Sequence, residues 1–270
     1  MRVAFIGSGA MGEAMISALL RHEACGPTDI RACDIDTARL AVIEKTYEVG
    51  CSVEVEKAIR DCDVVVLSVK PQVLSGVLSE LKRSLQPSQL VLSIVAGARL
   101  DTIRRGLAHD AVVRVMPNTP AQVGQGMSVW TAADAVTTKQ REAVQTILQS
   151  MGREINVPDE KYIDMATAIS GSGPAYLFLI LEALIDAGVH IGLPRDMAQE
   201  LAVQTMVGSG HVARETGRHP AELKNAVTSP GGTTAEALLQ LEDGGIRAII
   251  SQAVIAAYEK AQELGGQSSK

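Results

Sequence analysis

The run Asp63-Val-Val-Val-Leu-Ser-Val69 constrains the fold more than any other stretch of this 270-residue chain. It is apolar at nearly every position, whereas a strand with one side in solvent would alternate apolar and polar residues. A strand buried on both faces lies inside a parallel sheet that helices cover on both sides. The surrounding chain repeats the pattern, with helical stretches between β runs at Arg2–Ile6, Asp29–Asp34, Gln89–Val95 and Ala111–Met116. These β-α-β units predict an α/β fold with a doubly wound parallel sheet.

The pattern changes near residue 158, beyond which the sequence contains no further strand-like run. The apolar spacing there is helical, over Asp159–Ile169, Ser172–Ala187, Pro194–Ala213 and Ile246–Leu264. We therefore predict two domains, an α/β domain over residues 1–158 and an all-α domain over residues 159–270.

One predicted helix, Pro174–Ala187, is apolar on almost every side. Its only charges, Glu182 and Asp186, are four residues apart and share one face. Such a helix must be covered nearly all round, and a small helical domain has little surface with which to cover it. Two explanations stay open: a second copy of the chain completes the burial, or its own domain wraps the helix. The apolar stretch itself, Ala175–Ile185, is too short to span a bilayer.

The composition argues against several classes of partner. Aromatic residues make up only 3% and the net charge is −6, which disfavours a surface that binds nucleic acid. The four cysteines form no C-x-x-C pair and have no histidine at ligand spacing, so we expect free thiols in a reducing compartment and no metal site. Because the first predicted strand begins at Arg2, we expect no targeting sequence before it. We expect a cytoplasmic protein without a nucleic-acid or membrane partner.

A glycine-rich loop directly follows the first predicted strand. Gly7-Ser-Gly-Ala-Met-Gly12 matches G-x-G-x-x-G and opens a predicted helix, which is the context in which this pattern indicates dinucleotide binding. Gly7 allows the tight turn, Gly9 lets the backbone approach a pyrophosphate, and Gly12 allows close packing of helix and strand. The first domain is therefore predicted to be Rossmann-type. Its expected cofactor-binding residues here are Ile6, Gly7, Ser8, Gly9, Ala10, Met11 and Gly12.

The second predicted strand ends in an acidic residue, Asp34. A carboxylate at this position accepts hydrogen bonds from the adenosine ribose of NAD and repels the 2′-phosphate of NADP. Arg39 is nearby in the sequence and offsets part of this charge, so these residues favour NADH only weakly. For Asp36, an ordinary helix N-cap is the better interpretation.

Two further strand ends carry candidate cofactor contacts. Val69-Lys70-Pro71 and Ala96-Gly97 each follow a strand and so lie at the carboxyl edge of the sheet, where ligands bind in such folds. From spacing alone, Lys70 is explained better as a surface lysine before a proline that starts a helix.

The stretch Ser229-Pro-Gly-Gly-Thr-Thr234 breaks a helical region of the second domain. Thr233 and Glu236 match S/T-x-x-E, which predicts a capping box at the start of the next helix. A helix N-terminus flanked by glycines also presents uncovered N–H groups to an anion. The two interpretations are compatible. The expected anion-binding groups are the amides of Gly231, Gly232 and Thr233 and the hydroxyls of Ser229 and Thr234.

Five motifs taken together resemble one family. They are the Gly7–Gly12 loop, Ser68-Val-Lys-Pro71, Val115-Met-Pro-Asn-Thr-Pro120 with Val123-Gly-Gln-Gly126, Ala168-Ile-Ser-Gly-Ser-Gly-Pro174, and Val227-Thr-Ser-Pro-Gly-Gly-Thr-Thr234. From Met1 to about Leu264 the chain resembles pyrroline-5-carboxylate reductase, and S-P-G-G-T-T is close to a signature of that family. One position departs from the family: Val55 stands where a small polar residue, commonly Asn, contacts the adenosine side of the cofactor.

The resemblance implies that hydride from NADPH or NADH reduces L-1-pyrroline-5-carboxylate to L-proline. It implies that Asn118 and Thr119 line the nicotinamide pocket, although an Asx-type turn between Pro117 and Pro120 is an alternative. Given such a substrate, we expect the helix N-terminus at Ser229–Thr234 to hold its carboxylate. The hydroxyl of Thr234, the expected catalytic residue, would face the ring nitrogen or the carboxylate. Ser170–Gly173 fits either the family motif or a cap of the long apolar helix. The helical domains are expected to interlock as homodimers, often assembled further into decamers.

The expected mechanism needs no dedicated acid, because no His, Lys, Asp or Glu stands out in the motifs. An imine nitrogen is basic enough to be protonated by solvent, so catalysis is expected to rest on orientation of the reacting groups. Two other functions fit less well. A β-hydroxyacid dehydrogenase needs a lysine on the helix after the G-S-G segment, and Pro174–Ile185 contains none. A dinucleotide sensor without turnover does not need an intact S-P-G-G-T-T loop.

Overall fold

The computed structural model describes residues 1–267, which form two compact units. Among the described residues, the first unit contains Met1–Ser172 and residues 257–267, and the second is Gly173–Ala256. The domain boundary drawn at residue 158 from the sequence pattern stays a prediction.

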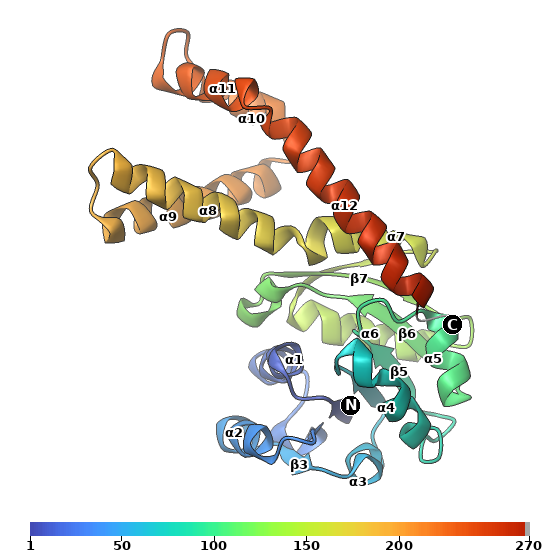
Figure 1. The fold of residues 1–270 in the computed structure, drawn as a ribbon. Coiled ribbons are helices and arrows are strands. Elements are labelled where there is room, and N and C mark those ends of the chain that lie inside the picture. Colours follow the sequence, from blue (N-terminus) through green and yellow to red (C-terminus); the bar gives the residue numbers. More distant parts are fainter. Residues whose placement is uncertain (268–270) are drawn as a thin grey trace. The chain divides into compact units, whose positions relative to one another are not determined.

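The first unit, which includes the blue and green parts of the ribbon in Figure 1, contains a central sheet. This sheet has eight strands in the order β3-β2-β1-β4-β5-β6-β7-β8. The five strands that the sequence predicts all form, as β1 (Val3–Ile6), β2 (Ile30–Cys33), β4 (Val64–Leu67), β5 (Leu90–Ser93) and β6 (Val112–Met116). Three more complete the sheet, β3 (Gly50–Ser52), β7 (Gly126–Ala132) and β8 (Gly152–Asn156). Within residues 1–267, β6 and β7 pair antiparallel and the other neighbouring strands of this sheet pair parallel. The predicted Rossmann-type doubly wound sheet is confirmed, and it is parallel except at that pair.

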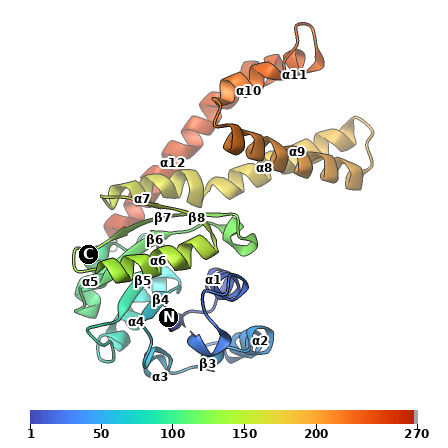
Figure 2. The ribbon, with the colours of Figure 1, turned by 180° about the vertical axis from the view of Figure 1, so that it is seen from behind.

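Both faces of the sheet are buried, as the apolar run in β4 predicts. Alternate residues of β1 and β4 enter two separate cores, Phe5 and Val66 in one and Ala4 and Val65 in the other, and all four are fully buried. Val55 also lies in the second core. The first core is covered by α1 (Ala10–Arg21), α2 (Thr37–Tyr47) and α6 (Thr138–Ser150), and the second by α3 (Val55–Ile59), α4 (Leu74–Leu81) and α5 (Leu100–Leu107) (Figure 2).

The second unit is helical throughout. α8 (Gly173–His190) and α9 (Arg195–Thr216) pack side by side, and a Cβ on Gly188 would lie 3.0 Å from the Cβ of Ala198, so the two backbones approach closely. α10 (Pro220–Ala226) and α11 (Thr233–Asp243) follow. α12 (Ile246–Gln267) begins in the second unit and ends in the first.

The chain enters α8 without a break. α7 (Lys161–Ala166) continues through a π-helical turn, Thr167–Gly171, in which the Ser172 amide donates to the Thr167 carbonyl oxygen (2.8 Å). The alternative that Ser170–Gly173 caps the start of the long helix is therefore wrong. The helix widens by one residue at this point, a distortion that is frequent at functional sites.

The apolar side chains of α8 are exposed. Phe178 and Leu179 are 62% and 66% exposed, so the explanation that its own domain wraps this helix is wrong. Ala175–Ile185 alone is too short to span a bilayer, but by length and composition alone the whole helical segment Lys161–His190 is apolar enough to cross a membrane, and 11% of its most apolar part is buried within the chain. A contiguous apolar surface on a helix marks a site of contact with another protein surface or a membrane.

Candidate functional site

Each glycine of the Gly7–Gly12 loop has the surroundings that its predicted role requires. Gly7 has φ +96°, and a Cβ there would lie 2.7 Å from the Ser68 carbonyl oxygen. A Cβ on Gly12 would lie 2.6 Å from the Gly7 carbonyl oxygen, so a larger residue would separate α1 from the loop. Around the Cβ position of Gly9, no atom of the described chain outside Gly9 and its two neighbours in the sequence lies within 4 Å. Gly7 and Gly12 therefore serve the fold of the loop, whereas Gly9 leaves open space above the backbone.

The N-terminus of α1 is suited to an anion. Its N-cap, Gly9, contributes no side chain, and the helical hydrogen bonds begin with the Glu13 amide, which donates to the Gly9 carbonyl oxygen (2.9 Å). The preceding amides stay available at the positive end of the helix dipole. The Ser8 hydroxyl is buried and has no partner among the described residues. The open space, the available amides and the unpaired hydroxyl together fit the pyrophosphate of NADH or NADPH.

Ser68, at the end of β4, holds the glycine loop in place. Its hydroxyl donates to the Gly7 carbonyl oxygen (2.6 Å), and its amide donates to the Ile6 carbonyl oxygen (2.9 Å). Ser68 belongs to the S-V-K-P motif, but the motif alone gives it no partner because Gly7 is 61 residues away in the chain. Lys70 is exposed directly before the turn that Pro71 begins, and its contact with the cofactor stays a prediction.

Asp34 is tied to the same loop. Its carboxylate accepts hydrogen bonds from the Ser8 amide (2.7 Å) and the Asp36 amide (3.1 Å). The predicted N-cap role of Asp36 is confirmed, since its carboxylate accepts from the first amides of α2. Burial raises the pKa of the neighbouring Cys33 thiol to about 11, so this thiol stays protonated at neutral pH. Asp34 therefore braces the loop, and its contact with a ribose stays a prediction.

Gly97 is required by packing within the first unit. It has φ +74°, and a Cβ there would lie 3.1 Å from the Cβ of Leu264 in α12. The neighbouring Ala96 is exposed. The glycine thus allows the C-terminal helix to pack against the loop after β5, and contact of Ala96 and Gly97 with the cofactor stays a prediction.

Asn118 connects three parts of the first unit. Its Nδ2 donates to the Ser170 carbonyl oxygen in the π-helical turn (3.0 Å), and its Oδ1 accepts from the Met127 amide in β7 (2.8 Å). The alternative of an Asx-type turn is wrong, because the Asn118 side chain makes no cap to the turn that follows it. Thr119 is exposed beside it. Asn118 therefore fixes the π-helical turn against the carboxyl edge of the sheet.

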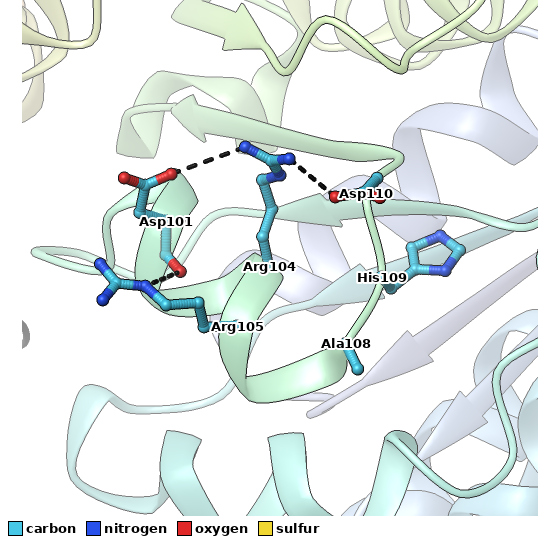
Figure 3. A pocket seen from close by; sticks show the side chains of 6 residues that line it. All are labelled: Asp101, Arg104, Arg105, Ala108, His109 and Asp110. Atoms are coloured by element: carbon cyan, nitrogen blue, oxygen red, sulfur yellow. Dashed lines mark hydrogen bonds and ion pairs between the residues drawn. The ribbon is translucent and has the colours of Figure 1, made fainter.

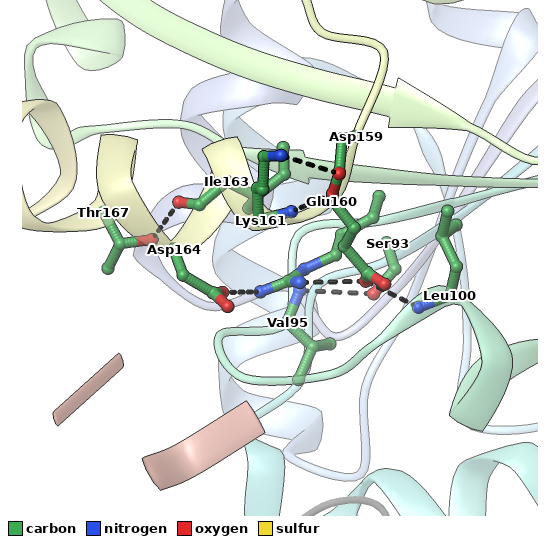
Figure 4. A network of polar contacts seen from close by, with 10 residues as sticks. Ser93, Val95, Leu100, Asp159, Glu160, Lys161, Ile163, Asp164 and Thr167 are labelled. Atoms are coloured by element: carbon green, nitrogen blue, oxygen red, sulfur yellow. Dashed lines mark hydrogen bonds and ion pairs between the residues drawn. The ribbon is translucent and has the colours of Figure 1, made fainter. Parts of the chain in front are cut away.

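A buried ion network fastens α7 to the sheet. Arg114 of β6 is 3% exposed, and its guanidinium pairs with Glu160 and Asp164, each at 2.8 Å. Glu160 also accepts the Leu100 amide at the start of α5 (2.8 Å; Figure 4). No local pattern predicts this network, because its acidic partners are 46 and 50 residues from Arg114 in the chain. It holds the helix that continues into the turn contacted by Asn118.

The Ser229–Thr234 loop precedes α11 in the second unit. Gly231 has φ +69°, and a Cβ on Gly232 would lie 2.5 Å from the Ser229 hydroxyl oxygen. The predicted capping box at Thr233 is wrong, because the extended backbone of Gly232 makes that residue the N-cap and Thr233 is already helical. The Gly232 amide donates to the Ser229 carbonyl oxygen (3.1 Å). Within the described residues, the amides of Gly231, Thr233 and Thr234 donate to no protein acceptor, which leaves them available to an anion.

The predicted site residues fall into two groups. Those expected at the cofactor belong to the first unit, and those expected at the substrate belong to the second. That the two groups meet around one substrate stays a prediction. Between residues 1 and 267, no three His, Cys, Asp or Glu side chains gather in a way that could hold a metal ion.

A pocket of about 430 Å³ at the end of α5 contains none of the predicted site residues. Figure 3 shows its lining, Asp101, Arg104, Arg105, Ala108, His109 and Asp110. Arg104 pairs with Asp110 (2.7 Å) and Asp101 (3.6 Å), and the hydrogen bond to Asp110 raises the pKa of its guanidinium. These charges satisfy one another, so the pocket gives no reason to place a ligand in it.

Comparisons with known proteins lead to one family. A model for pyrroline-5-carboxylate reductase dimerisation matches residues 160–264, and one described as NADP oxidoreductase, coenzyme F420-dependent, matches residues 2–97. Pyrroline-5-carboxylate reductase from Synechocystis sp. is 42% identical over 98% of each chain, and that from Escherichia coli is 37% identical over 97% of this chain and 98% of its own. The crystal structure of Plasmodium falciparum pyrroline carboxylate reductase with NADP bound is 32% identical, covers 98% of each chain and has a TM-score of 0.90.

Proposed function

The chain belongs to the pyrroline-5-carboxylate reductase family, and on this premise we propose which of its residues reduce L-1-pyrroline-5-carboxylate to L-proline. The reaction is the last step of proline biosynthesis. NADH or NADPH, when bound, supplies the hydride that reduces the C=N bond. The observation that carries the assignment of residues is the pair of anion sites, one at the N-terminus of α1 and one at the N-terminus of α11.

The cofactor belongs to the first unit. The loop Gly7–Gly12 takes the pyrophosphate on the amides of α1, and Asp34 faces the adenosine ribose. The remaining contacts come from the carboxyl ends of β4, β5 and β6, through Val69, Lys70, Pro71, Ala96, Gly97, Asn118 and Thr119. Asn118 acts here chiefly by holding the Ser170 carbonyl and β7 together at this edge.

The substrate belongs to the Ser229–Thr234 loop. Its carboxylate lies against the amides of Gly231 and Thr233, and Gly232, which has no side chain, lets it approach the backbone. The Ser229 hydroxyl adds a donor. The Thr234 hydroxyl faces the ring nitrogen or the carboxylate and is the residue expected to contact the reacting part of the substrate.

Catalysis rests on orientation. The imine nitrogen is protonated by solvent before reduction, so the chain needs no acid of its own, and the clamped carboxylate fixes which face of the ring is presented. Holding the imine carbon and the hydride donor in the correct orientation raises their effective concentration, and this accounts for a large part of the rate enhancement.

The family has a dimerisation domain, so the chain forms oligomers. We propose a homodimer that buries the apolar side chains of α8, with further assembly into a decamer. We also propose that the enzyme is cytoplasmic and acts without a membrane or nucleic-acid partner.

The test is a kinetic assay of reduced-nicotinamide oxidation with L-1-pyrroline-5-carboxylate, and of nicotinamide reduction with a 3-hydroxy acid as the alternative substrate.

Thr234→Val is expected to lower kcat/KM. The lowering corresponds to a loss of roughly 1–3 kcal/mol of transition-state stabilisation, which is the cost of removing the partner of a buried polar group. Thr146→Val is the control, since it removes an exposed helical hydroxyl that bonds only to its own helix. Unchanged kinetics in Thr234→Val would remove Thr234 from the site.

A further inference from the structure

The segment after β2 places carboxylates directly beside the glycine loop. One Asp34 oxygen accepts the Ser8 amide at 2.7 Å, and the other accepts the Asp36 amide at 3.1 Å. These contacts hold the Asp34 carboxylate against the backbone that is proposed to take the pyrophosphate. A carboxylate has about four lone-pair sites, so Asp34 keeps acceptor capacity for the hydroxyls of a ribose.

Arg39 is the nearby cation that could offset this charge, and it is already engaged. Its Nε donates to the Ser8 carbonyl oxygen (2.7 Å), and its Nη2 forms an ion pair with Glu13 of α1. Both side chains are about three-quarters buried, at 27% and 28% exposed, so the pair is shielded better than a surface ion pair. The Arg39 guanidinium is therefore neutralised and held on the glycine loop.

Tyr47 supports the same arrangement from α2. Its hydroxyl donates to the second Glu13 oxygen (3.1 Å). Burial, together with this hydrogen bond, raises the pKa of Tyr47, so it remains a donor at neutral pH. Glu13 is thus kept in a position where it pairs with Arg39.

Ile35, between the two aspartates, is 93% exposed and contributes to neither core. Its side chain offers an apolar surface to an adenine ring but no donor to a phosphate. Over the three residues Asp34, Ile35 and Asp36, the side chains therefore present two negative charges and no hydrogen-bond donor.

From this arrangement we infer that the enzyme binds NADH more tightly than NADPH. In a Rossmann-type site, the end of the second strand faces the 2′-position of the adenosine ribose. A 2′-hydroxyl donates to Asp34, whereas a 2′-phosphate meets the charges of Asp34 and Asp36, with Arg39 paired to Glu13. The inference rests on the proposed function, because it requires the cofactor to lie on the Gly7–Gly12 loop.

Isothermal titration calorimetry of the full-length oligomer, without substrate, tests the inference directly. The Kd for NADPH is expected to exceed that for NADH by about tenfold or more, since a like charge replaces a hydrogen bond. The pair 5′-AMP and adenosine 2′,5′-bisphosphate, which differ only in the 2′-phosphate, should show the same order. Equal or tighter binding of NADPH overturns the inference and leaves the proposed function intact. Binding of neither dinucleotide overturns the proposed cofactor site and this inference with it.

Two variants identify the residues responsible. Asp34→Asn keeps an acceptor oxygen for the Ser8 amide but removes the charge, and it should narrow the difference between NADH and NADPH. Glu13→Gln frees Arg39 and should tighten NADPH relative to NADH by about threefold or more. Glu44→Gln removes one charge from an exposed position on α2 and serves as the control. If Glu44→Gln changed the ratio as much as Glu13→Gln, net charge would explain the preference, and the assignment to this cluster would be wrong.

Discussion

Among single residues, substitutions of Gly7 and Gly9 should have different effects: the first is expected to lower the stability of the fold, and the second is expected to weaken cofactor binding. Gly7→Ala forces a side chain into φ +96° and against the Ser68 carbonyl, so we expect it to lower the free energy of unfolding by about 1–3 kcal/mol. Gly9→Ala adds a methyl group that meets no residue beyond its sequence neighbours within 4 Å, so stability should stay within about 0.5 kcal/mol of the parent. That methyl should nevertheless weaken NADH binding, because it occupies the space proposed for the pyrophosphate.

Urea unfolding and calorimetric NADH binding, measured on both variants, check this expectation. Gly9→Ala with the parent affinity would show that the pyrophosphate does not lie over this backbone. A Gly7→Ala protein as stable as the parent would mean that the loop relaxes around the added methyl group.

Local rules predict residue roles only where the partner is close in the sequence. The roles of Gly7 and Gly12 and the cap at Asp36 follow from positions within one turn, and the structure confirms them. Thr233 shows the limit of such rules, because S/T-x-x-E places the cap one residue too late when the preceding glycine is already extended. The contacts that Ser68 makes with Gly7 and Leu264 makes with Gly97 join distant parts of the chain, and no short motif contains both partners.

At the scale of elements, the Arg114 network decides how firmly α7 is held to β6. Arg114→Met leaves Asp164 and Glu160 without their cation, and breaking a buried pair in this way costs about 3–5 kcal/mol of stability. The double variant Arg114→Met/Asp164→Leu removes both charges and should recover part of the loss. Arg104→Met is the control, since its ion pairs are partly exposed and should contribute only about 0–1 kcal/mol.

Urea unfolding of the parent, Arg114→Met, Asp164→Leu and the double variant, analysed as a double-mutant cycle, gives the coupling between Arg114 and Asp164. Additive losses for the two single changes would show that the pair is not coupled and that α7 is held by its apolar contacts instead.

Element prediction succeeded where burial leaves an unbroken apolar run. β1, β4 and β5 are fully buried, and the sequence predicts each of them. β3 has only three residues, and β8 is half exposed at the edge of the sheet, so neither has an apolar pattern long enough to recognise. β7 follows a loop with the 3-10 helix Thr119–Val123 and runs antiparallel to β6, which the repeated β-α-β pattern does not anticipate.

For the whole molecule, the pattern of helix-like and strand-like segments in the sequence predicts the order of the elements better than it predicts which elements form one compact unit. The helical pattern begins near residue 158, but α7 and the π-helical turn belong to the first unit. α12 returns to the first unit at its C-terminal end, where Leu264 packs on Gly97. The local sequence of α12 does not predict that its end belongs to the first unit, because a helix has the same periodicity whichever unit it packs against.

Oligomerisation is the property of the whole molecule on which the apolar surface of α8 depends. Leu179 is 66% exposed in the single chain, and burying a leucine of this kind stabilises an interface by about 1.5–3 kcal/mol. Leu179→Glu replaces that gain with a buried, unpaired charge in each copy, so we expect dissociation toward monomers and loss of activity together. Val42→Glu makes the same chemical change at a half-exposed position on α2 and should leave the assembly intact.

Size-exclusion chromatography with light scattering measures the mass of each protein, and vesicle flotation of the parent tests the competing membrane explanation. If α8 is the interface, the parent is an oligomer that does not float with vesicles, and only Leu179→Glu becomes smaller. An oligomer that survives Leu179→Glu would place the contact elsewhere. Flotation of the parent chain would instead assign the apolar helix to a lipid surface, since the same exposed leucines and phenylalanine satisfy either environment.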